Sequence, residues 1–596
     1  MANYTPPLRD MRFVYHDLLG CDELAELPGF EEFTPDLIDP ILEEAGKICA
    51  EVLHPINRSG DEEGCTLENG VVRTPAGFPE AYRQFREGGW TAMTCDPAYG
   101  GQGLPAAADV LVTEMICSAN LSFGMYPGLS HGAYLALHSH GSEELKQAYL
   151  PKLVDGTWSG TMCLTEPHCG TDLGLLRTKA QPQEDGSFCI TGTKIFISAG
   201  EHDLTENIIH LVLARLPDAP KGSRGISLFL VPKFLPTAEG APGARNGVQC
   251  SSIEHKMGIK ASSTCVMNFD GAQGWLVGAP HKGLQAMFTM MNNERLAVGG
   301  QGLGLAEAAY QGSVAYARER LQGRSLTGTK APDKPADPII VHPDVRRMLL
   351  LQRAATEGCR AMAVWVAKEL DKQTHHPDPE VRKTSEDFVA LMTPIVKALF
   401  TDLGFENANL GMQVLGGHGY IREHGMEQYV RDARITQIYE GTNGIQALDL
   451  VGRKLGANGG RLLRRFFHPV SEYIEQHAQN PEMARYIAPL AKAFGRLQTA
   501  SATVARRGLA NPDEAGAAAT DYLRLFGLTA MGYLWARMAE TAMTQSRETG
   551  DPDGFYATKQ VTARFYMERM LPQTGTLLSQ IMAGGETLMA LDEAAF

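Results

Sequence analysis

The chain contains 596 residues, of which 44% are hydrophobic and 21% are charged. This balance is typical of a folded protein with several domains and excludes a disordered or fibrous chain. Acidic residues number 69 against 54 basic ones, so the formal net charge is −15. That charge disfavours non-specific attraction to nucleic acid or to an anionic membrane. We therefore expect a soluble protein that does not bind nucleic acid.

The pattern of cysteines and the N-terminal residues indicate the cellular compartment. The eleven cysteines are scattered and form no CxxC pair, a pattern typical of reduced thiols rather than of a zinc site. The opening residues, MANYTPPLRDMRF, lack the apolar core of a signal peptide. No run of about 18 or more apolar residues occurs, so we expect no membrane span. These features predict a cytoplasmic protein.

The periodicity of apolar residues changes along the chain. Between Asp36 and Leu53, apolar residues recur at spacings of three and four, which predicts one buried helical face: Ile41, Leu42, Ala45, Ile48, Cys49, Val52 and Leu53. From about residue 161 to 274, short runs rich in β-branched and aromatic residues predict strands, at 188–198, 208–214 and 225–231. Helical periodicity then returns to about residue 455. A Pro-rich stretch, 329–343, interrupts it and is expected to be an exposed insertion.

These changes predict a mainly α protein with a central β-domain. The expected domains are an N-terminal helical domain (1–160), a β-domain (161–274), a helical bundle (275–455) and an extra helical domain (461–596). The glycines of Gly456–Gly460 predict a linker before the last domain. Residues 457–596 hold 14 basic and 14 acidic residues, so this extension is neutral overall.

One glycine-rich motif invites a misleading interpretation. Gly299–Gly304 resembles a dinucleotide-binding loop, but such a loop needs a preceding strand, and both flanks here predict helix. We therefore expect these glycines to serve close helix packing. The chain also contains no HExxH motif and no GxSxG motif in a plausible setting. This disfavours a zinc enzyme or a serine hydrolase.

Five motifs follow one another across some 280 residues: Cys163–Asp172, Gly192–Gly200, Glu294–Arg295 with Glu319–Gln322, Gln413–Tyr420 and Ile438–Asn443. In this order and spacing, residues 30–455 resemble the acyl-CoA dehydrogenase family. The tail beyond residue 460 resembles the extra C-terminal domain of its larger bacterial members. The resemblance implies a helical, β-barrel and four-helix-bundle fold, with a helical extension.

The resemblance also implies the function. It implies FAD-dependent α,β-dehydrogenation of an acyl-CoA thioester to trans-2-enoyl-CoA in fatty acid β-oxidation, with medium- or long-chain substrates. It implies an electron-transfer flavoprotein as the electron acceptor, and a homodimer. Alternatives are a 3-methylmercaptopropionyl-CoA dehydrogenase, an acyl-CoA oxidase, a DNA-binding alkylation-response relative and a catalytically silent subunit. The neutral extension disfavours the DNA-binding relative, and Glu440 argues against the silent subunit.

Two glutamates compete for the role of the base. A carboxylate can remove the α-proton if desolvation raises its pKa towards neutrality. By resemblance, Glu440 in the YEGT motif is that base, and Gly441 lets the substrate approach the backbone. Some relatives instead place the base at the position of Glu294, and this sequence has both carboxylates. We prefer Glu440.

The resemblance also assigns binding residues. Those expected to bind FAD are Met162, Leu164, Thr165, Gly170, Thr171, Phe196, Ser198, Arg320, Gln322, Gln413, Gly416, Gly417, Thr442 and Asn443. Those expected to bind substrate are Thr171, Asn292, Arg295 and Gly441. Phe196 stands where Trp is frequent, Gly323 where Phe is usual after the RxQ motif, and Gly444 where Gln is common. Arg320 and Gln322 resemble residues that reach the FAD of a neighbouring subunit.

Overall fold

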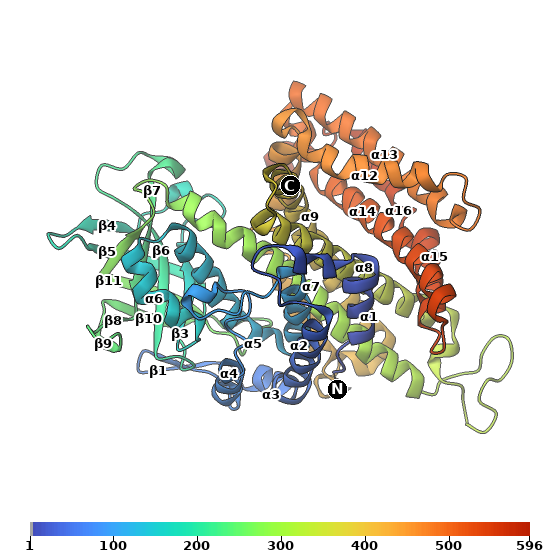
Figure 1. Ribbon diagram of the computed structural model, residues 1–596, viewed down its shortest axis with the longest axis horizontal. Helices are drawn as coiled ribbons and strands as arrows, with labels where there is room; N and C mark the ends of the chain where they lie inside the picture. The colour runs from blue at the N-terminus through green and yellow to red at the C-terminus, as the bar shows by residue number, and fades with distance from the viewer. Residues whose placement is uncertain (1–3) are drawn as a thin grey trace. The chain divides into compact units, whose positions relative to one another are not determined.

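A computed structural model of the protein describes residues 4–596 and divides into two compact units (Figure 1). The helical unit comprises the described residues up to Glu44, Pro105–Ser118 and Val298–Phe596. The barrel unit comprises Ala45–Leu104 and Ala119–Ala297. Three helices contribute residues to both units: α2 (Pro35–Ile48), α5 (Ala106–His140) and α7 (Gly283–Glu319).

The barrel unit combines short helices with all the strands of the described chain. Its further helices are α3 (Asn57–Glu63), α4 (Phe78–Glu87) and α6 (Glu143–Val154). Its strands are β1 (Thr66–Glu68), β2 (Val71–Arg73), β3 (Trp158–Cys163), β4 (Lys179–Pro182), β5 (Phe188–Ser198), β6 (Asn207–Arg215), β7 (Ile226–Pro232), β8 (Phe234–Pro236), β9 (Pro242–Arg245), β10 (Val248–Ile253) and β11 (Thr264–Val277).

Seven of these strands build a barrel. Strands β11, β5, β4, β6 and β7 pair in that order, and β7 pairs again with β11, which closes the ring. Strand β10 adds to β11, and β3 runs parallel to β6. The core inside includes Ile190, Val212 and Phe229, each fully buried. The expected strands are confirmed as β5, β6 and β7, because their β-branched runs fill this core.

The helical unit is built from the remaining helices. They are α1 (Leu8–Arg12), α8 (Pro343–His375), α9 (Pro379–Leu415), α10 (Met426–Thr436), α11 (Asn443–Asp449), α12 (Arg461–His477), α13 (Ala484–Ala510), α14 (Pro512–Thr549), α15 (Phe555–Phe565) and α16 (Gln573–Ala583). The expected buried face of residues 41–53 is confirmed. Leu42, Ala45, Cys49 and Leu53 are buried, although the helix gives way to a π-helical turn at Cys49.

The glycine-rich motif of residues 299–304 lies inside α7, as expected from its helical flanks. A Cβ atom at Gly302 would lie 2.6 Å from the carbonyl oxygen of Phe400, and one at Gly304 would lie 2.6 Å from Cβ of Cys117. These distances are too short for any side chain. The glycines therefore let α7 pack closely on α9 and α5. Because they lie inside a helix, they do not form a dinucleotide-binding loop.

The extra C-terminal helices pack on α8 and α9 within the helical unit, rather than forming a separate body (Figure 1). Trp535 of α14 is fully buried and donates from Nε1 to the carbonyl oxygen of Ala354 at 3.1 Å. A Cβ atom at Gly527 would lie 2.7 Å from Leu399. These long-range contacts join segments that are distant in the chain into one unit, while the four domain boundaries expected from the sequence stay predictions.

Two helical segments are long and apolar enough to qualify as membrane spans by length and composition, at Ala106–His140 and Pro379–Tyr420. Within the fold, 78% and 83% of their most apolar windows are buried. Such burial is what the core helices of a folded protein require.

Two buried histidines predict acid sensitivity of the barrel unit. Desolvation lowers the pKa of both His202 and His210 to about 3. Since an unfolded histidine has a pKa near 6.5, each contributes stability that is present above pH 6.5 and lost as pH falls towards 3. At pH 5 the expected loss is about 2 kcal/mol per histidine.

We expect His210→Leu to make urea unfolding less sensitive to acid between pH 7.5 and pH 5. The control is His255→Leu, at an exposed position of the same unit. The two variants should differ in the pH dependence of the unfolding free energy. Equal dependence in both would show that burial of His210 does not govern the acid response.

Candidate active site

A buried ion pair fixes the loop that follows β3. The Lys194 ammonium of β5 is fully buried and donates to the carbonyl oxygen of Leu164 and to Oε1 of Glu166, both at 2.9 Å. Glu166 also accepts from the backbone N–H groups of Arg177 (2.7 Å) and Thr178 (3.0 Å). Burial opposes ionisation of Glu166, but the charge of Lys194 leaves its pKa lowered. One carboxylate therefore ties both ends of the loop that carries Leu164, Thr165, Gly170 and Thr171.

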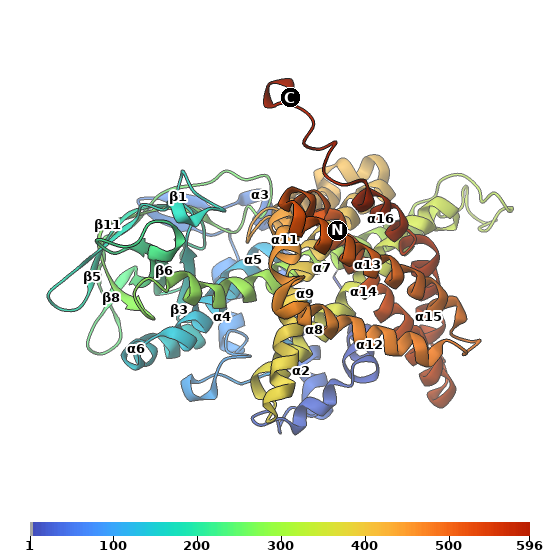
Figure 2. The ribbon, with the colours of Figure 1, turned by 90° about the horizontal axis from the view of Figure 1, so that it is seen from above.

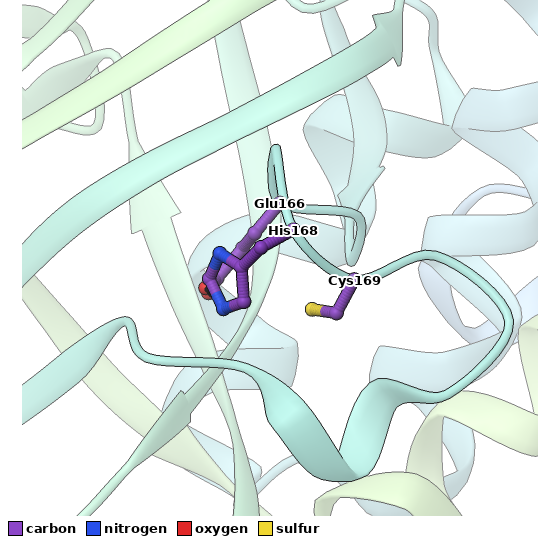
Figure 3. A group of neighbouring side chains, drawn as sticks. All are labelled: Glu166, His168 and Cys169. Atoms are coloured by element: carbon purple, nitrogen blue, oxygen red, sulfur yellow. Dashed lines mark ion pairs between the residues drawn. The ribbon is translucent and has the colours of Figure 1, made fainter.

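Glu166 also belongs to a cluster that resembles a metal site. Glu166, His168 and Cys169 present one ligand atom each within 4.8 Å of one another (Figure 3). The Glu166 carboxylate, however, is already engaged by Lys194 and the backbone of the loop. Nε2 of His168 lies 3.0 Å from the carbonyl oxygen of Leu175, and burial raises the pKa of the Cys169 thiol. These contacts favour a structural role for the cluster.

Phe196 directly follows the residue of β5 whose backbone bonds to this loop. The backbone N–H of Ile195 donates to the carbonyl oxygen of Thr165 at 2.9 Å, which joins the loop to β5. Phe196 follows with φ of +58°, a conformation that bulky residues rarely adopt, and its side chain is 58% exposed. Backbone strain of this kind clusters at functional sites. Met162 and Ser198 are half-buried at the ends of β3 and β5.

The alternative base Glu294 is buried within α7, with 5% of its surface exposed. A Cβ atom at Gly132 would lie 2.5 Å from Oε1 of Glu294, so the absence of a side chain there makes room for the carboxylate. The neighbouring Arg295 donates to Oδ1 of Asn292 at 3.2 Å, and Asn292 is exposed. The two expected substrate contacts on α7 therefore contact each other.

Glu440 lies on the turn between α10 and α11 in the helical unit. Its φ is +56°, and that of Gly441 is +83°, so two consecutive residues are left-handed. Gln446, which is buried, donates from Nε2 to the carbonyl oxygens of Glu440 (3.4 Å) and Gly441 (3.1 Å). The Tyr439 hydroxyl donates to Oε1 of Gln301 on α7. The surroundings thus impose a strained backbone on the one carboxylate of the motif.

Asn443 fixes this turn to α9. Its amide group accepts from Nζ of Lys397 (2.8 Å) and donates to Oδ1 of Asp402 (2.8 Å) and Oγ1 of Thr401 (3.0 Å). These bonds engage both ends of the amide, so any hydrogen bond from Asn443 to a cofactor would have to compete with them. Thr442, by contrast, is exposed.

The end of α9 leaves its backbone accessible. A Cβ atom at Gly416 or Gly417 would meet no protein atom within 4 Å, and Gly416 has φ of +59°. Gln413 is exposed on the preceding turn. The Tyr316 hydroxyl of α7 and Nδ1 of His418 lie 2.9 Å apart, an interaction that sequence patterns did not suggest. This corner can accept a ligand close to its backbone.

The RxQ motif follows α7 as an extended segment. Leu321 bridges Pro338, and the backbone N–H of Gln322 donates to the carbonyl oxygen of Asp337 at 2.9 Å. The side chains of Arg320 and Gln322 are both exposed. Gly323, which stands where phenylalanine is usual, has φ of +70° and allows the chain to turn into the Pro-rich loop.

Asp337 organises that loop. Its carboxylate is buried and accepts from the backbone N–H groups of Ser325 (2.8 Å), Lys330 (3.0 Å) and Ala331 (2.7 Å), and from Arg324. These bonds, led by that of Ser325, lower its pKa to about 2. The predicted insertion therefore has an ordered centre, which composition alone did not indicate.

We expect Asp337→Ala to loosen residues 320–342 while α8 stays folded. The variant removes the acceptor for three backbone N–H groups, each costly to leave unsatisfied. Hydrogen exchange of peptides covering 320–342 should rise, whereas Asp344→Ala, at an exposed position, should leave it unchanged. Equal exchange in both variants would contradict a role for Asp337 in ordering the loop.

Four family models match consecutive parts of the chain. They describe the acyl-CoA dehydrogenase N-terminal domain (residues 39–157), middle domain (161–272) and C-terminal domain (281–455), and an acetyl-CoA dehydrogenase C-terminal-like domain (466–592).

Two relatives match along nearly their whole length. A 3-methylmercaptopropionyl-CoA dehydrogenase of Ruegeria pomeroyi is 43% identical and covers 98% of this chain and 99% of its own. A broad-specificity linear acyl-CoA dehydrogenase of Mycobacterium tuberculosis is 34% identical, with all of both chains covered. Among solved structures, an acyl-CoA dehydrogenase from Bacillus anthracis complexed with FAD has the same fold, with a TM-score of 0.74 at 21% identity, over 98% of this chain and 92% of its own. The chain therefore belongs to the acyl-CoA dehydrogenase family, whose members are FAD-dependent oxidoreductases.

Proposed function

We propose that the chain is an FAD-dependent acyl-CoA dehydrogenase that converts an acyl-CoA thioester into trans-2-enoyl-CoA, with Glu440 as the base. The observation that supports this role most directly is the left-handed backbone of Glu440 in the YEGT turn, held by Gln446. Strain maintained by several contacts is typical of a catalytic residue. When bound, FAD supplies the acceptor for the hydride from the β-carbon.

The residues present fit a flavin cofactor. Gly416 and Gly417 leave open space beside the backbone, where an adenosine group can approach closely. Phe196 offers an exposed ring for contact with the flavin. Exposed Arg320 and Gln322 suit a cofactor bound by a second copy of the chain, so we propose a homodimer. The bonds of Asn443 to α9 make Thr442 the better candidate on the turn.

The residues of the chain would then carry the proton chemistry. The Glu440 carboxylate removes the α-proton of the thioester and holds it on a carboxylate oxygen. Gly441, without a side chain, leaves room for the substrate at the adjacent backbone. Backbone N–H groups are suited to stabilise the charge that develops on the thioester oxygen. Glu294, in the barrel unit, is the alternative base.

For the substrate, we propose 3-methylmercaptopropionyl-CoA as the first candidate and straight-chain fatty acyl-CoA as the second. The first is named by the relative with 43% identity, and the second by relatives with 34% identity, which are a butyryl-CoA and a broad-specificity linear acyl-CoA dehydrogenase. We further propose an electron-transfer flavoprotein as the acceptor and a cytoplasmic location.

The test is anaerobic titration of the purified holoenzyme with 3-methylmercaptopropionyl-, butyryl-, octanoyl- and palmitoyl-CoA. Bleaching of the flavin absorption band is the readout, and the thioester that bleaches the flavin at the lowest concentration identifies the substrate class. Rapid reoxidation in air with stoichiometric peroxide would identify an oxidase instead. Binding without bleaching by every thioester would contradict the proposed activity.

A further inference from the structure

The last eleven residues of the chain, 586–596, form an exposed segment rich in apolar and acidic side chains. Every residue in it is exposed, including Leu588 (62%), Met589 (65%), Leu591 (56%) and Phe596 (89%). Figure 2 shows the segment extending away from α16. It also carries three acidic residues and no basic one. We call residues 586–596 the acidic apolar segment.

The root of this segment is fixed. The backbone N–H of Gly585 donates to Oε1 of Glu514 at 3.1 Å. Arg507 pairs with the same carboxylate at 3.6 Å and donates to the carbonyl oxygen of Met582 at 3.1 Å. The segment therefore leaves the helical unit from a defined point. Apolar side chains gathered on such a surface mark an interaction site.

A groove of complementary character lies elsewhere in the helical unit, along the start of α8 and the end of α15. Its volume is about 660 Å³. Leu350, Val561 and Phe565 supply an apolar lining, and Val561 is 61% exposed. Four arginines surround this lining: Arg346, Arg347, Arg564 and Arg569. We call this feature the arginine groove.

Two of the four arginines are balanced within the groove. Arg347 pairs with Asp344 at 2.9 Å, and Arg564 pairs with Glu568 at 2.8 Å. Arg346 and Arg569 are exposed and form no ion pair within residues 4–596. The groove therefore presents two uncompensated positive charges next to an apolar surface, and suits an acidic, apolar peptide.

We propose that the acidic apolar segment of one copy of this chain docks in the arginine groove of a second copy. Asp592 and Glu593 match the charges of Arg346 and Arg569, while Leu588, Leu591 and Phe596 match the apolar lining. Burial of the apolar side chains supplies most of the affinity, and the exposed charge pairs fix register and partner. In a single chain the groove stays open and the segment stays in solvent. This contact does not depend on the substrate or the base proposed above.

Photo-crosslinking of the full-length holoenzyme tests the contact. Phe596 is replaced by p-benzoylphenylalanine, and isotope-labelled and unlabelled protein are mixed before irradiation. We expect covalent dimers containing one labelled and one unlabelled chain, cross-linked at peptides that cover 343–350 and 561–569. The matched control places the same photoreactive residue at Leu509, which is 90% exposed on α13, and should give few such dimers.

Charge exchange identifies the groove independently. Because Arg346 and Arg569 are exposed, Arg346→Glu with Arg569→Glu should leave the fold intact. It should lower the yield of covalent dimer at least about fivefold, as expected for repulsion worth about 1 kcal/mol. Adding Asp592→Arg and Glu593→Arg should restore the yield. Cross-links within one chain, cross-links outside the groove peptides, no cross-links, or a yield insensitive to these charges would each overturn the proposal.

Discussion

We expect Glu440→Gln to slow flavin bleaching by the best thioester about 10³-fold, within the range of 10²–10⁴ for loss of a general base. The glutamine side chain has nearly the size of glutamate and should preserve the left-handed turn, because Gln446 holds the backbone and Tyr439 bonds to Gln301. Loss of rate would then report loss of the carboxylate. The measurement is stopped-flow bleaching under anaerobic conditions, together with the affinity for the enoyl-CoA product.

Glu294→Gln is the matched control, since it makes the same chemical change on α7. Glu294 is buried where Gly132 provides space, so the amide fits the same site. We expect bleaching within a few-fold of wild type and unchanged product affinity. If Glu294→Gln loses the rate while Glu440→Gln keeps it, the base is Glu294, and the turn at Glu440 has another role. If both variants lose it, the two carboxylates act together.

The Glu440 turn shows which parts of the candidate site could be predicted from the sequence. The motif around Glu440 and the runs that form β5, β6 and β7 are local patterns, and periodicity or resemblance places them directly. Gln446, which holds the turn, carries no local signal, because its role depends on backbone geometry. The Lys194–Glu166 pair joins residues 28 positions apart, so it becomes visible only once β5 lies beside the loop.

Features of the fold that could not be predicted from the sequence depend on contacts between residues far apart in the chain. Periodicity predicts that the last 136 residues are helical, but not that Trp535 packs on α8, 181 positions away. The same holds for Arg360, which looks like an ordinary charged residue of an amphipathic helix. In the structure it is 1% exposed and binds three carboxylates from distant segments.

Arg360 lies at the centre of a buried charge network in the helical unit. Its guanidinium donates from Nε to Oε2 of Glu114 on α5 at 2.9 Å and from Nη2 to Glu307 on α7 at 2.7 Å, and it also contacts Asp10 on α1. Lys559 of the C-terminal extension binds the same Asp10. Burial outweighs the attraction of Arg360 and raises the pKa of Glu114 to about 7. The network therefore links the first helix and the extension to the core.

Arg360→Met should destabilise the helical unit by about 3–5 kcal/mol, because methionine fills similar space but leaves buried carboxylates without their main partner. Urea unfolding followed by circular dichroism at pH 7.5 measures the loss. Arg547→Met, which breaks the exposed pair with Glu482, should have no measurable effect.

A second variant and a change of pH separate charge imbalance from lost packing. Adding Glu114→Gln removes one uncompensated charge, so the double variant should be more stable than Arg360→Met alone. A carboxyl whose folded pKa is raised contributes stability that is present at low pH and lost as pH rises through that pKa. Because the charge of Arg360 lowers the pKa of Glu114, its removal should raise that pKa further, so the variant gains more stability than wild type on acidification. The deficit of Arg360→Met should therefore shrink between pH 7.5 and pH 6. A deficit that is independent of pH and unchanged by Glu114→Gln would mean that Arg360 stabilises the unit through packing alone.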